Sequence, residues 1–288
     1  MTKNPINVET KEEILIEALP YIQTYEGKTF VIKYGGAAMT DENLKKSFAQ
    51  DVTILRKIGV NIVIVHGGGK DITDLATRLN IKTSFVDGQR YTDEEMVSVV
   101  MMVLAGKLNK EIVNLINSNG GNAVGLCGVD NQLLRATRSL KNGIDLGLVG
   151  EVHTVDTNFL NLLSTNGMMP VIAPLAVDDD GKILNINADL AAGAVASALK
   201  AEKLVYLSDI EGVLVDGKLV SSLTELEAES LIERGAVTGG MIPKVRSGFS
   251  TLKTGVKKIH IVDGRIKHSL LLEIFTDEGI GTQMIHES

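Results

Sequence analysis

The sequence is poor in residues that lock a fold covalently or rigidly. Its 288 residues include one cysteine, no tryptophan and five prolines. A single cysteine excludes an internal disulfide, and such a chain is typical of a reducing compartment. Because Cys127 lies in an apolar context, we interpret it as a core residue rather than a nucleophile. The cysteine usage therefore favours a cytoplasmic protein.

Excess positive charge and long apolar runs are missing as well. The 29 lysines and arginines face 36 acidic residues, which gives a net charge of −7. That charge argues against nucleic acid or an anionic membrane as a partner, so an anionic ligand needs local lysines and backbone amides. No run approaches the roughly 18 apolar residues of a membrane span, and we see no signal peptide at the N-terminus. We expect a soluble protein.

Several familiar catalytic signatures are also absent. Residues 27–29 have the end of a P-loop, but Ile22 stands where its first glycine belongs. No G-x-G-x-x-G follows a predicted strand, and no G-x-S-x-G elbow accompanies the glycines after His66. Neither H-E-x-x-H nor clustered cysteines indicate a metal held by the protein. We interpret His66 as structural rather than as a general base.

Apolar runs alternate with amphipathic stretches along most of the chain. This alternation predicts parallel βαβ units, with helices on both faces of a mainly parallel sheet. The expected strands cover residues 29–33, 61–65, 123–127, 148–152, 169–175, 203–207 and 258–262. The expected helices cover residues 41–58, 72–79, 92–119, 156–163, 190–199, 224–235 and 266–275, with Thr92 and Glu95 forming a capping box.

A helix precedes the first strand, and Pro20 inside it predicts a kink. Its apolar residues can fold back on their own domain or pack on another subunit, and the sequence leaves both open. We divide the chain into this kinked helix (1–26), an N-terminal lobe (27–177) and a C-terminal lobe (178–288). The boundary falls at a hairpin signalled by the turn sequence of residues 178–181.

A set of loops at strand ends offers glycine amides, lysines, asparagines and aspartates. These loops are residues 33–36, 67–69, 185–189, 208–209 and 239–244. Such groups suit phosphoryl transfer, where catalysis is mostly positioning and charge neutralisation. Each has a plain alternative: Lys33 and Arg90 can be merely solvated, Asn185 and Asn187 can end a hairpin, and Asp189 can simply cap a helix.

The loop sequences 31–36, 65–69, 185–189 and 239–244 resemble, in this order, those of the amino-acid-kinase family. The resemblance runs from about residue 28 to residue 282. The leading helix and residues 259–265 and 272–276 are similar to the arginine-inhibited, hexameric branch of that family. The resemblance implies a three-layer αβα sandwich. It also implies that the N-terminal lobe binds an acyl amino acid and forms the dimer contact, and that the C-terminal lobe binds ATP.

The reaction implied by this resemblance is ATP-dependent phosphorylation of the γ-carboxylate of N-acetyl-L-glutamate in arginine biosynthesis. The implied catalytic residues are Lys33, Lys244 and Asp189, and the implied substrate-binding residues are Gly68, Gly69, Arg90, Asn185 and Asn187. The implied ATP-binding residues are Gly35, Gly36, Ser208, Asp209 and Gly239. Mg²⁺ would be held mainly by ATP phosphates, with no metal ligands from the protein. The alternatives are a sister kinase acting on another small acid, or a non-catalytic amino-acid sensor.

The branch resemblance also implies feedback inhibition by L-arginine and a homo-oligomer, a hexamer built as a trimer of dimers. The implied inhibitor-binding residues are Tyr21, Lys203, His260, Glu273 and Gly279. These roles are carried over from the resemblance rather than deduced from the chemistry of the residues.

Overall fold

The computed structural model describes residues 8–86, 88–141, 143–239, 241–276 and 279–286. Residues 1–7 of the predicted N-terminal segment and Gly240 of the predicted lysine loop lie outside the described residues. The central sheet has the order β14-β16-β15-β11-β1-β2-β8-β5 and is parallel except between β15 and β16. Its strands are β1 (Thr29–Tyr34), β2 (Asn61–His66), β5 (Ala123–Cys127), β8 (Met169–Ala173), β11 (Lys203–Ser208), β14 (Ser222–Leu223), β15 (Lys258–Asp263) and β16 (Thr282–Met284).

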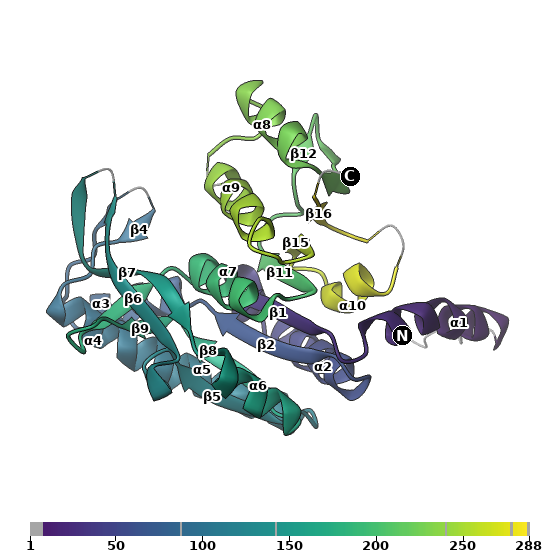
Figure 1. Cartoon of the computed structure of the whole chain (residues 1–288), viewed down its shortest axis with the longest axis horizontal. Helices are drawn as coiled ribbons and strands as arrows, with labels where there is room; N and C mark the ends of the chain where they lie inside the picture. The colour runs from purple at the N-terminus through teal and green to yellow at the C-terminus, as the bar shows by residue number, and fades with distance from the viewer. Residues whose placement is uncertain (1–7, 87, 142, 240, 277–278, 287–288) are drawn as a thin grey trace.

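Helices cover both faces of this sheet, because successive residues of a strand point to opposite sides. Val31 of β1 packs in one core cluster with residues of α7, whereas Phe30 and Ile32 pack in another with residues of α2. The predicted three-layer αβα fold is therefore confirmed (Figure 1). The helices are α1 (Val8–Tyr25), α2 (Glu42–Lys57), α3 (Gly69–Arg78), α4 (Glu94–Met101), α5 (Asn109–Ser118), α6 (Thr157–Thr165), α7 (Ala188–Leu199), α8 (Glu225–Glu233), α9 (Met241–Leu252) and α10 (Ser269–Ile274), with short helical turns η1 (Gly36–Met39), η2 (Met102–Leu108) and η3 (Asp130–Gln132).

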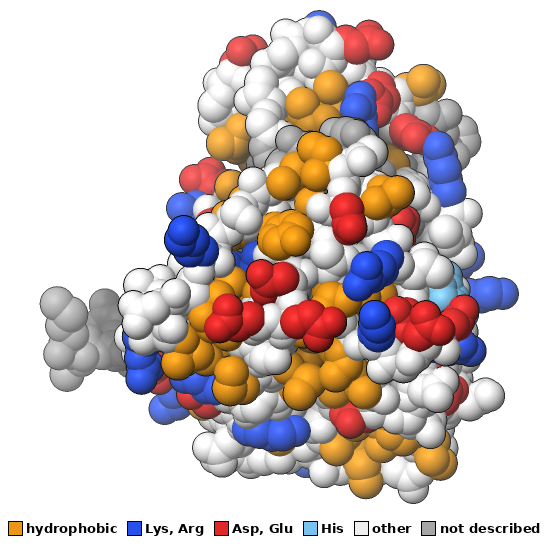
Figure 2. All heavy atoms as spheres, turned by 90° about the vertical axis from the view of Figure 1, so that its left-hand side faces the viewer, with side chains coloured by type: hydrophobic (Ala, Val, Ile, Leu, Met, Phe, Trp, Pro, Cys, Tyr) orange, Lys and Arg blue, Asp and Glu red, His pale blue; other side chains and the backbone are white. Residues whose placement is uncertain are grey.

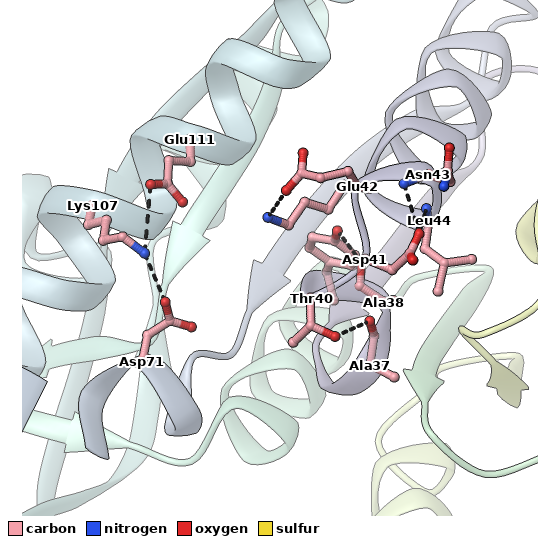
Figure 3. A network of polar contacts seen from close by, with 12 residues as sticks. Ala37, Ala38, Thr40, Asp41, Glu42, Asn43, Leu44, Asp71, Lys107 and Glu111 are labelled. Carbon is pink, nitrogen blue, oxygen red and sulfur yellow. Dashed lines mark hydrogen bonds and ion pairs between the residues drawn. The ribbon is translucent and has the colours of Figure 1, made fainter. Parts of the chain in front are cut away.

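Local capping signals placed several helix ends correctly. Asp41 accepts hydrogen bonds from the backbone N–H groups of Asn43 and Leu44 at the start of α2 (Figure 3). The capping box of Thr224 and Glu227 is formed at the start of α8. Such side-chain acceptors satisfy amides that the first turn of a helix leaves without partners.

A small second sheet was only partly predicted. Strand β7 (Ile144–Val155) extends well beyond the predicted 148–152, and its partner β6 (Leu134–Lys141) was not predicted. The alternating, charged sequence of β6 carries no apolar run that would mark it as a strand. The predicted strand 169–175 ends at Ala173, since Pro174 has no N–H for a ladder, and the chain continues as β9 (Leu175–Val177). With β10 (Ile183–Ile186), these strands close into a barrel at one end of the main sheet.

The long helical region predicted over 92–119, with Gly106 as a break or a close packing point, differs from the structure at its start and in its middle. Asp93, not Thr92, caps α4 by accepting from the N–H of Met96, and the hydroxyl of Thr92 donates to the carbonyl of Arg90 instead. The middle segment η2 is a π-helix, which contains Gly106. A π-helical turn inserts one residue and shifts the side chains that follow it.

Two shorter predictions also need correction. Gln89 and Arg90 are not a loop: they form β4 (Gln89–Arg90), which pairs with β3 (Phe85–Val86) in a hairpin. The helix predicted over 266–275 is confined to α10, after His268 adopts a left-handed backbone. A further hairpin pairs β12 (Leu214–Val215) with β13 (Lys218–Leu219), and it turns at Asp216 and Gly217, which both have positive φ.

Helix α1 lies at the edge of the molecule and projects from its body (Figure 1). Pro20 lies inside it, and Ile16 and Leu19 on it are exposed by 62% and 50%. At its C-terminal end the buried Tyr25 packs edge-on against Phe30, and the partly buried Tyr21 packs edge-on against Phe275. This end of α1 therefore packs on its own chain, whereas Ile16 and Leu19 do not.

The molecular surface mixes charges of both signs. On the face shown in Figure 2, lysine and arginine side chains are interleaved with aspartate and glutamate among the coloured residues. No helix in the described part of the chain is both long and apolar enough to span a bilayer.

Candidate active site

One carboxylate joins the two lysines predicted from separate loops. Lys33 at the end of β1 lies 3.0 Å from Asp189 Oδ1, and Lys244 in α9 lies 2.8 Å from Asp189 Oδ2. The side chains of both lysines are 14% exposed, and that of Asp189 is 26% exposed. Two ammonium groups distant in the sequence thus converge on one point.

Burial alone would raise the pKa of Asp189, but the charges of Lys33 and Lys244 outweigh it and hold that pKa below its usual range. Asp189 is not the cap of α7. Asn187 takes that position and accepts from the N–H groups of Asp189 and Leu190. The carboxylate of Asp189 is consequently left to the two lysines.

Gly35 and Gly36 let the loop after β1 lie close to the Lys33 side chain and to Asp209, which follows β11. A Cβ on Gly35 would lie 2.8 Å from the Nζ of Lys33, so only glycine leaves this lysine room to reach Asp189. Gly36 has φ of +65°, a left-handed conformation that favours glycine, and an added Cβ there would lie 3.6 Å from the backbone nitrogen of Asp209. The Gly35-Gly36 turn therefore lies between the two cavities described next.

The first cavity has a volume of about 280 Å³. It contains most of the predicted catalytic and substrate-binding residues. Among those lining it are Lys33, Gly35, Gly36, Gly68, Gly69, Arg90, Asn185, Asn187 and Asp189. Lys244 is not in this wall and reaches Asp189 from α9. The cavity thus lies at the carboxyl ends of β1 and β2, where open α/β sheets bind ligands.

Arg90 is buried in the wall of this cavity rather than solvated. Its Nη2 donates to the carbonyl of Gly69 and the hydroxyl of Thr73, both at 2.9 Å, and its guanidinium lies 4.7 Å from the centre of the Phe85 ring. Its Nη1 is buried and has no hydrogen-bond partner among the described residues. A buried cationic donor without a partner is costly unless a ligand supplies an acceptor.

Asn185 is oriented by a residue that the sequence interpretation gave a different role. Its amide donates to the hydroxyl of Thr92 at 3.1 Å, and that hydroxyl donates to the carbonyl of Arg90. Thr92 is fully buried and so links the Asn185 side chain to the backbone of Arg90. A buried threonine beside a predicted site arginine is a weak signal, and its match to a capping box masked it.

Of the predicted nucleotide residues, Gly35 and Gly36 line the first cavity, whereas one lines a second cavity of about 330 Å³. Asp209 lines it, and the hydroxyl of the buried Ser208 lies 3.4 Å from a carboxylate oxygen of Asp209. Gly239 is not among the lining residues, although Thr238 is. The sequence interpretation missed the remaining wall, which includes Ile210, Glu211, Gly212, Val213, Leu214, Ala236, Val237, Met241 and Arg265.

A third cavity, of about 660 Å³, lies beside α1. All five residues predicted for inhibitor binding line it: Tyr21, Lys203, His260, Glu273 and Gly279. Lys203 Nζ lies 3.2 Å from His260 Nε2, and His260 Nδ1 lies 2.6 Å from Glu273. The other oxygen of Glu273 accepts from the N–H groups of Ile280 and Gly281.

The charges of this third cavity are strongly shaped by burial. Burial, with repulsion from Lys258, lowers the pKa of Lys203 to about 8. Burial also lowers the pKa of His260, so we take this imidazole as neutral: it donates from Nδ1 to Glu273 and accepts at Nε2 from Lys203. Burial opposes the charge of Glu273, but its hydrogen bonds from His260 and the backbone keep its pKa lowered.

No group of three or more histidine, cysteine, aspartate or glutamate side chains is placed to hold a metal ion among the described residues. A divalent cation accompanying a nucleotide would therefore take most of its ligands from phosphate oxygens and water, as Mg²⁺ commonly does.

Comparison with known proteins places the chain in a family. Residues 28–263 match the model of the amino acid kinase family. The chain is 57% identical to the acetylglutamate kinase of Chlorobium luteolum, over 96% of this chain and 90% of that protein. It is 53% identical to the acetylglutamate kinase of Caldanaerobacter subterraneus subsp. tengcongensis, over 95% of this chain and 93% of that protein.

Comparison with solved structures shows that other proteins share this fold. An N-acetylglutamate synthase from Neisseria gonorrhoeae, complexed with coenzyme A and N-acetyl-glutamate, superposes with a TM-score of 0.87 at 29% identity over 96% of this chain. The chain spans only 64% of that synthase. The same synthase complexed with coenzyme A and L-arginine has a TM-score of 0.83 at 27% identity, over 96% of this chain and 66% of that one. The chain belongs to the amino acid kinase family.

Proposed function

We propose that this protein transfers the γ-phosphoryl group of ATP to the γ-carboxylate of N-acetyl-L-glutamate, giving an acyl phosphate and ADP in arginine biosynthesis. The observation that carries the proposal is the convergence of Lys33 and Lys244 on Asp189 beside a cavity lined with glycine backbone. Relatives more than 50% identical over nearly the whole chain are named acetylglutamate kinase.

Lys33 and Lys244 stabilise the charge that spreads over the equatorial oxygens of the phosphoryl group in flight. Asp189 holds the two ammonium groups at the required separation and does not act as a base. No base is needed, because a carboxylate with a pKa of about 4.3 is already ionised at neutral pH. The reaction therefore depends on positioning and charge, which is what the cavity offers.

The acceptor is bound in the first cavity. Arg90 pairs with its α-carboxylate through the guanidinium edge that has no partner within the protein. Asn185 and Asn187 bind the N-acetyl amino acid, and Gly68 and Gly69 direct backbone N–H groups at substrate and phosphoryl oxygens. These roles explain why a buried arginine is left with an unused donor.

The nucleotide lies across the Gly35-Gly36 turn and in the second cavity, next to Ser208, Asp209 and the segment containing Gly239. Mg²⁺ would be carried mainly by the phosphates of ATP, and we assign no step to it. In this arrangement residues 27–177 form the acceptor lobe, which also forms the dimer contact, and residues 178–288 form the ATP lobe.

The test is ADP release measured with a panel of acceptors: N-acetyl-L-glutamate, glutamate, aspartate, carbamate and a nucleoside monophosphate. We expect N-acetyl-L-glutamate to be strongly preferred. No preference for it would favour a sister activity of the same fold. Ligand binding without ADP release from any acceptor would favour a non-catalytic amino-acid sensor.

We further propose that L-arginine inhibits the enzyme from the third cavity, and that α1 joins dimers into a hexamer. Two observations favour this. Residues from α1, β11, β15 and α10 meet in one cavity that holds both an ammonium group and a carboxylate, as a zwitterionic amino acid requires. Helix α1 also leaves Ile16 and Leu19 exposed beside it.

Deletion of residues 1–26 tests both parts of this second proposal. We expect a dimer by light scattering that arginine inhibits poorly, because both the exposed helix and Tyr21 are removed. An unchanged mass would reject the hexamer role of α1, and unchanged inhibition would reject the role of Tyr21.

A further inference from the structure

The imidazole of His66 is one buried group that the proposed function leaves unused. His66 ends β2 immediately before the glycines of the first cavity, and its side chain has no exposed surface. Its Nδ1 lies 2.9 Å from the carbonyl oxygen of Gly67. A carbonyl can only accept, so the proton of this contact must be on Nδ1.

The other ring nitrogen shows how this tautomer is held. Burial lowers the pKa of His66 to about 4, so the ring is neutral at physiological pH and Nε2 carries no proton. Nε2 faces the side-chain amide of Asn109 at 3.3 Å. That amide has two hydrogens and also donates to the carbonyls of Leu126 and Val171, at 3.1 and 2.8 Å, so one hydrogen is shared between Nε2 and a carbonyl, and the amide nitrogen is held on this side. Asn109 thus presents a donor, not an acceptor, to His66.

The backbone carbonyls of Gly67, Gly68 and Gly69, which form the glycine loop, each accept a hydrogen bond from another group of the protein. His66 takes the carbonyl of Gly67, the N–H of Ile72 takes that of Gly68, and Arg90 takes that of Gly69. In a planar trans peptide the carbonyl and the following N–H point in opposite directions. Holding the Gly67 carbonyl towards His66 therefore turns the N–H of Gly68 away from the imidazole.

The π-helix η2 packs against the same glycine loop. A Cβ on Gly68 would lie 2.4 Å from Leu108 and 2.6 Å from Leu104, so both leucines of η2 are packed against this glycine. Lys107 of η2 also pairs with Asp71 in the first turn of α3, at 2.8 Å (Figure 3). The π-helical turn ends at Asn109, which places the two leucines under Gly68 and the amide beside His66.

We propose that His66 and Asn109 are positioning residues that set the direction of the Gly68 amide in the phosphoryl-transfer site. Asn109 fixes the imidazole tautomer, and the Nδ1–H of His66 fixes the peptide between Gly67 and Gly68. This inference rests on the proposed function for its effect on rate. Its structural part, the orientation of one peptide, stands without it.

The test compares His66→Asn with His66→Gln in the full chain. The amide nitrogen of asparagine can occupy the place of Nδ1 and donate to Gly67, whereas glutamine reaches only the place of Nε2. We expect His66→Asn to keep kcat within about threefold and His66→Gln to lower it about 10- to 100-fold. The loss in His66→Gln should be smaller than that caused by removing an oxyanion-hole donor, because the Gly68 amide is misdirected but still present. The KM for ATP should change less than about threefold in both.

A second measurement separates failure of this inference from failure of the proposed function. With ¹⁵N-glycine labelling, the Gly67 and Gly68 amide resonances of the ligand-free protein should shift in His66→Gln and stay near their original positions in His66→Asn. Equal effects of the two substitutions on kcat, on melting temperature and on these resonances would overturn the inference. Unmodified protein that releases no ADP with N-acetyl-L-glutamate would reject the proposed function, while the resonances would still decide the role of His66.

Discussion

The first and third cavities lie at opposite ends of the same parallel strands. Lys33 is near the carboxyl end of β1, whereas Lys203 starts the neighbouring strand β11 and pairs in register with Phe30. Each lysine points into a cavity that also contains a carboxylate. At the carboxyl end of β2 the chain enters the N-terminus of α3, which has no side-chain cap and presents backbone amides and a positive dipole end. The amino ends lack these, so side chains alone set the character of the third cavity.

The first and third cavities also differ in their balance of positive and negative groups. In the first cavity one carboxylate, Asp189, serves two lysines, and Arg90 adds a further positive charge. In the third, a neutral imidazole separates Lys203 from Glu273. The first arrangement suits ligands rich in negative charge, such as phosphates and carboxylates. The second offers both signs at once and suits a zwitterion.

The largest expected effect on activity comes from removing either of the two lysines that contact Asp189. We expect Lys33→Ala or Lys244→Ala to lower kcat by about 10²- to 10³-fold, because each removes a charge aimed at the phosphoryl group. Lys253→Ala is a matched control, since Lys253 directly follows the helix that carries Lys244 but pairs with Glu225 at the surface. Steady-state ADP release gives kcat, and a thermal melt checks folding. Near-normal activity in either variant would remove the phosphoryl-transfer role of this cavity.

Arg90→Lys should act on the acceptor rather than on the nucleotide. A lysine cannot bond Gly69, Thr73 and a ligand carboxylate at once, so we expect the KM for N-acetyl-L-glutamate to rise about 10- to 100-fold. The KM for ATP should change much less. Arg246→Lys, which weakens an exposed pair with Glu229, is the control. Equal changes in both KM values would show that Arg90 supports the site as a whole and does not select the acceptor.

The sequence predicted the layered fold because strand and helix signals in it are local. Buried strands such as 61–65 are short apolar runs, and caps such as Asp41 are read within four residues. The features it missed depend on contacts distant in the chain. Strand β6 is stabilised by its pairing with β7, and the cap of α4 moved from Thr92 to Asp93 because Thr92 is engaged with Arg90 and Asn185.

The same distinction applies to the sites. The loop motifs and the family resemblance named Lys33, Asp189 and Lys244, but no spacing rule placed two lysines on one carboxylate. Much of the wall of the second cavity was missed because residues such as Val213 and Ala236 are apolar and carry no chemical signal. The π-helical turn that places Asn109 beside His66 was hidden inside a pattern typical of an ordinary helix.

A change in the third cavity should alter inhibition rather than catalysis. We expect Glu273→Gln to raise the arginine concentration for half-inhibition more than about tenfold, because the charge facing a ligand cation is removed. The assay expresses inhibition relative to the uninhibited rate of each variant. Glu225→Gln, at an exposed pair with Lys253, is the charge-matched control. Unaltered inhibition by arginine in Glu273→Gln would place the inhibitor elsewhere.

The smallest expected effect concerns stability, and it tests whether the third cavity really desolvates its lysine. The pKa of Lys203 is about 8 in the folded chain, against about 10.4 for an ordinary lysine. Between these values the unfolded state binds more protons than the folded state, so this residue makes stability rise with pH. Lys203→Met should abolish that contribution, a relative change of about 3 kcal/mol between pH 7.5 and pH 10.5. Urea unfolding of the original protein and the variant at both pH values gives the difference. A constant difference would mean that water solvates Lys203 at its ordinary pKa, and the contrast in burial between the two ends of the sheet would be lost.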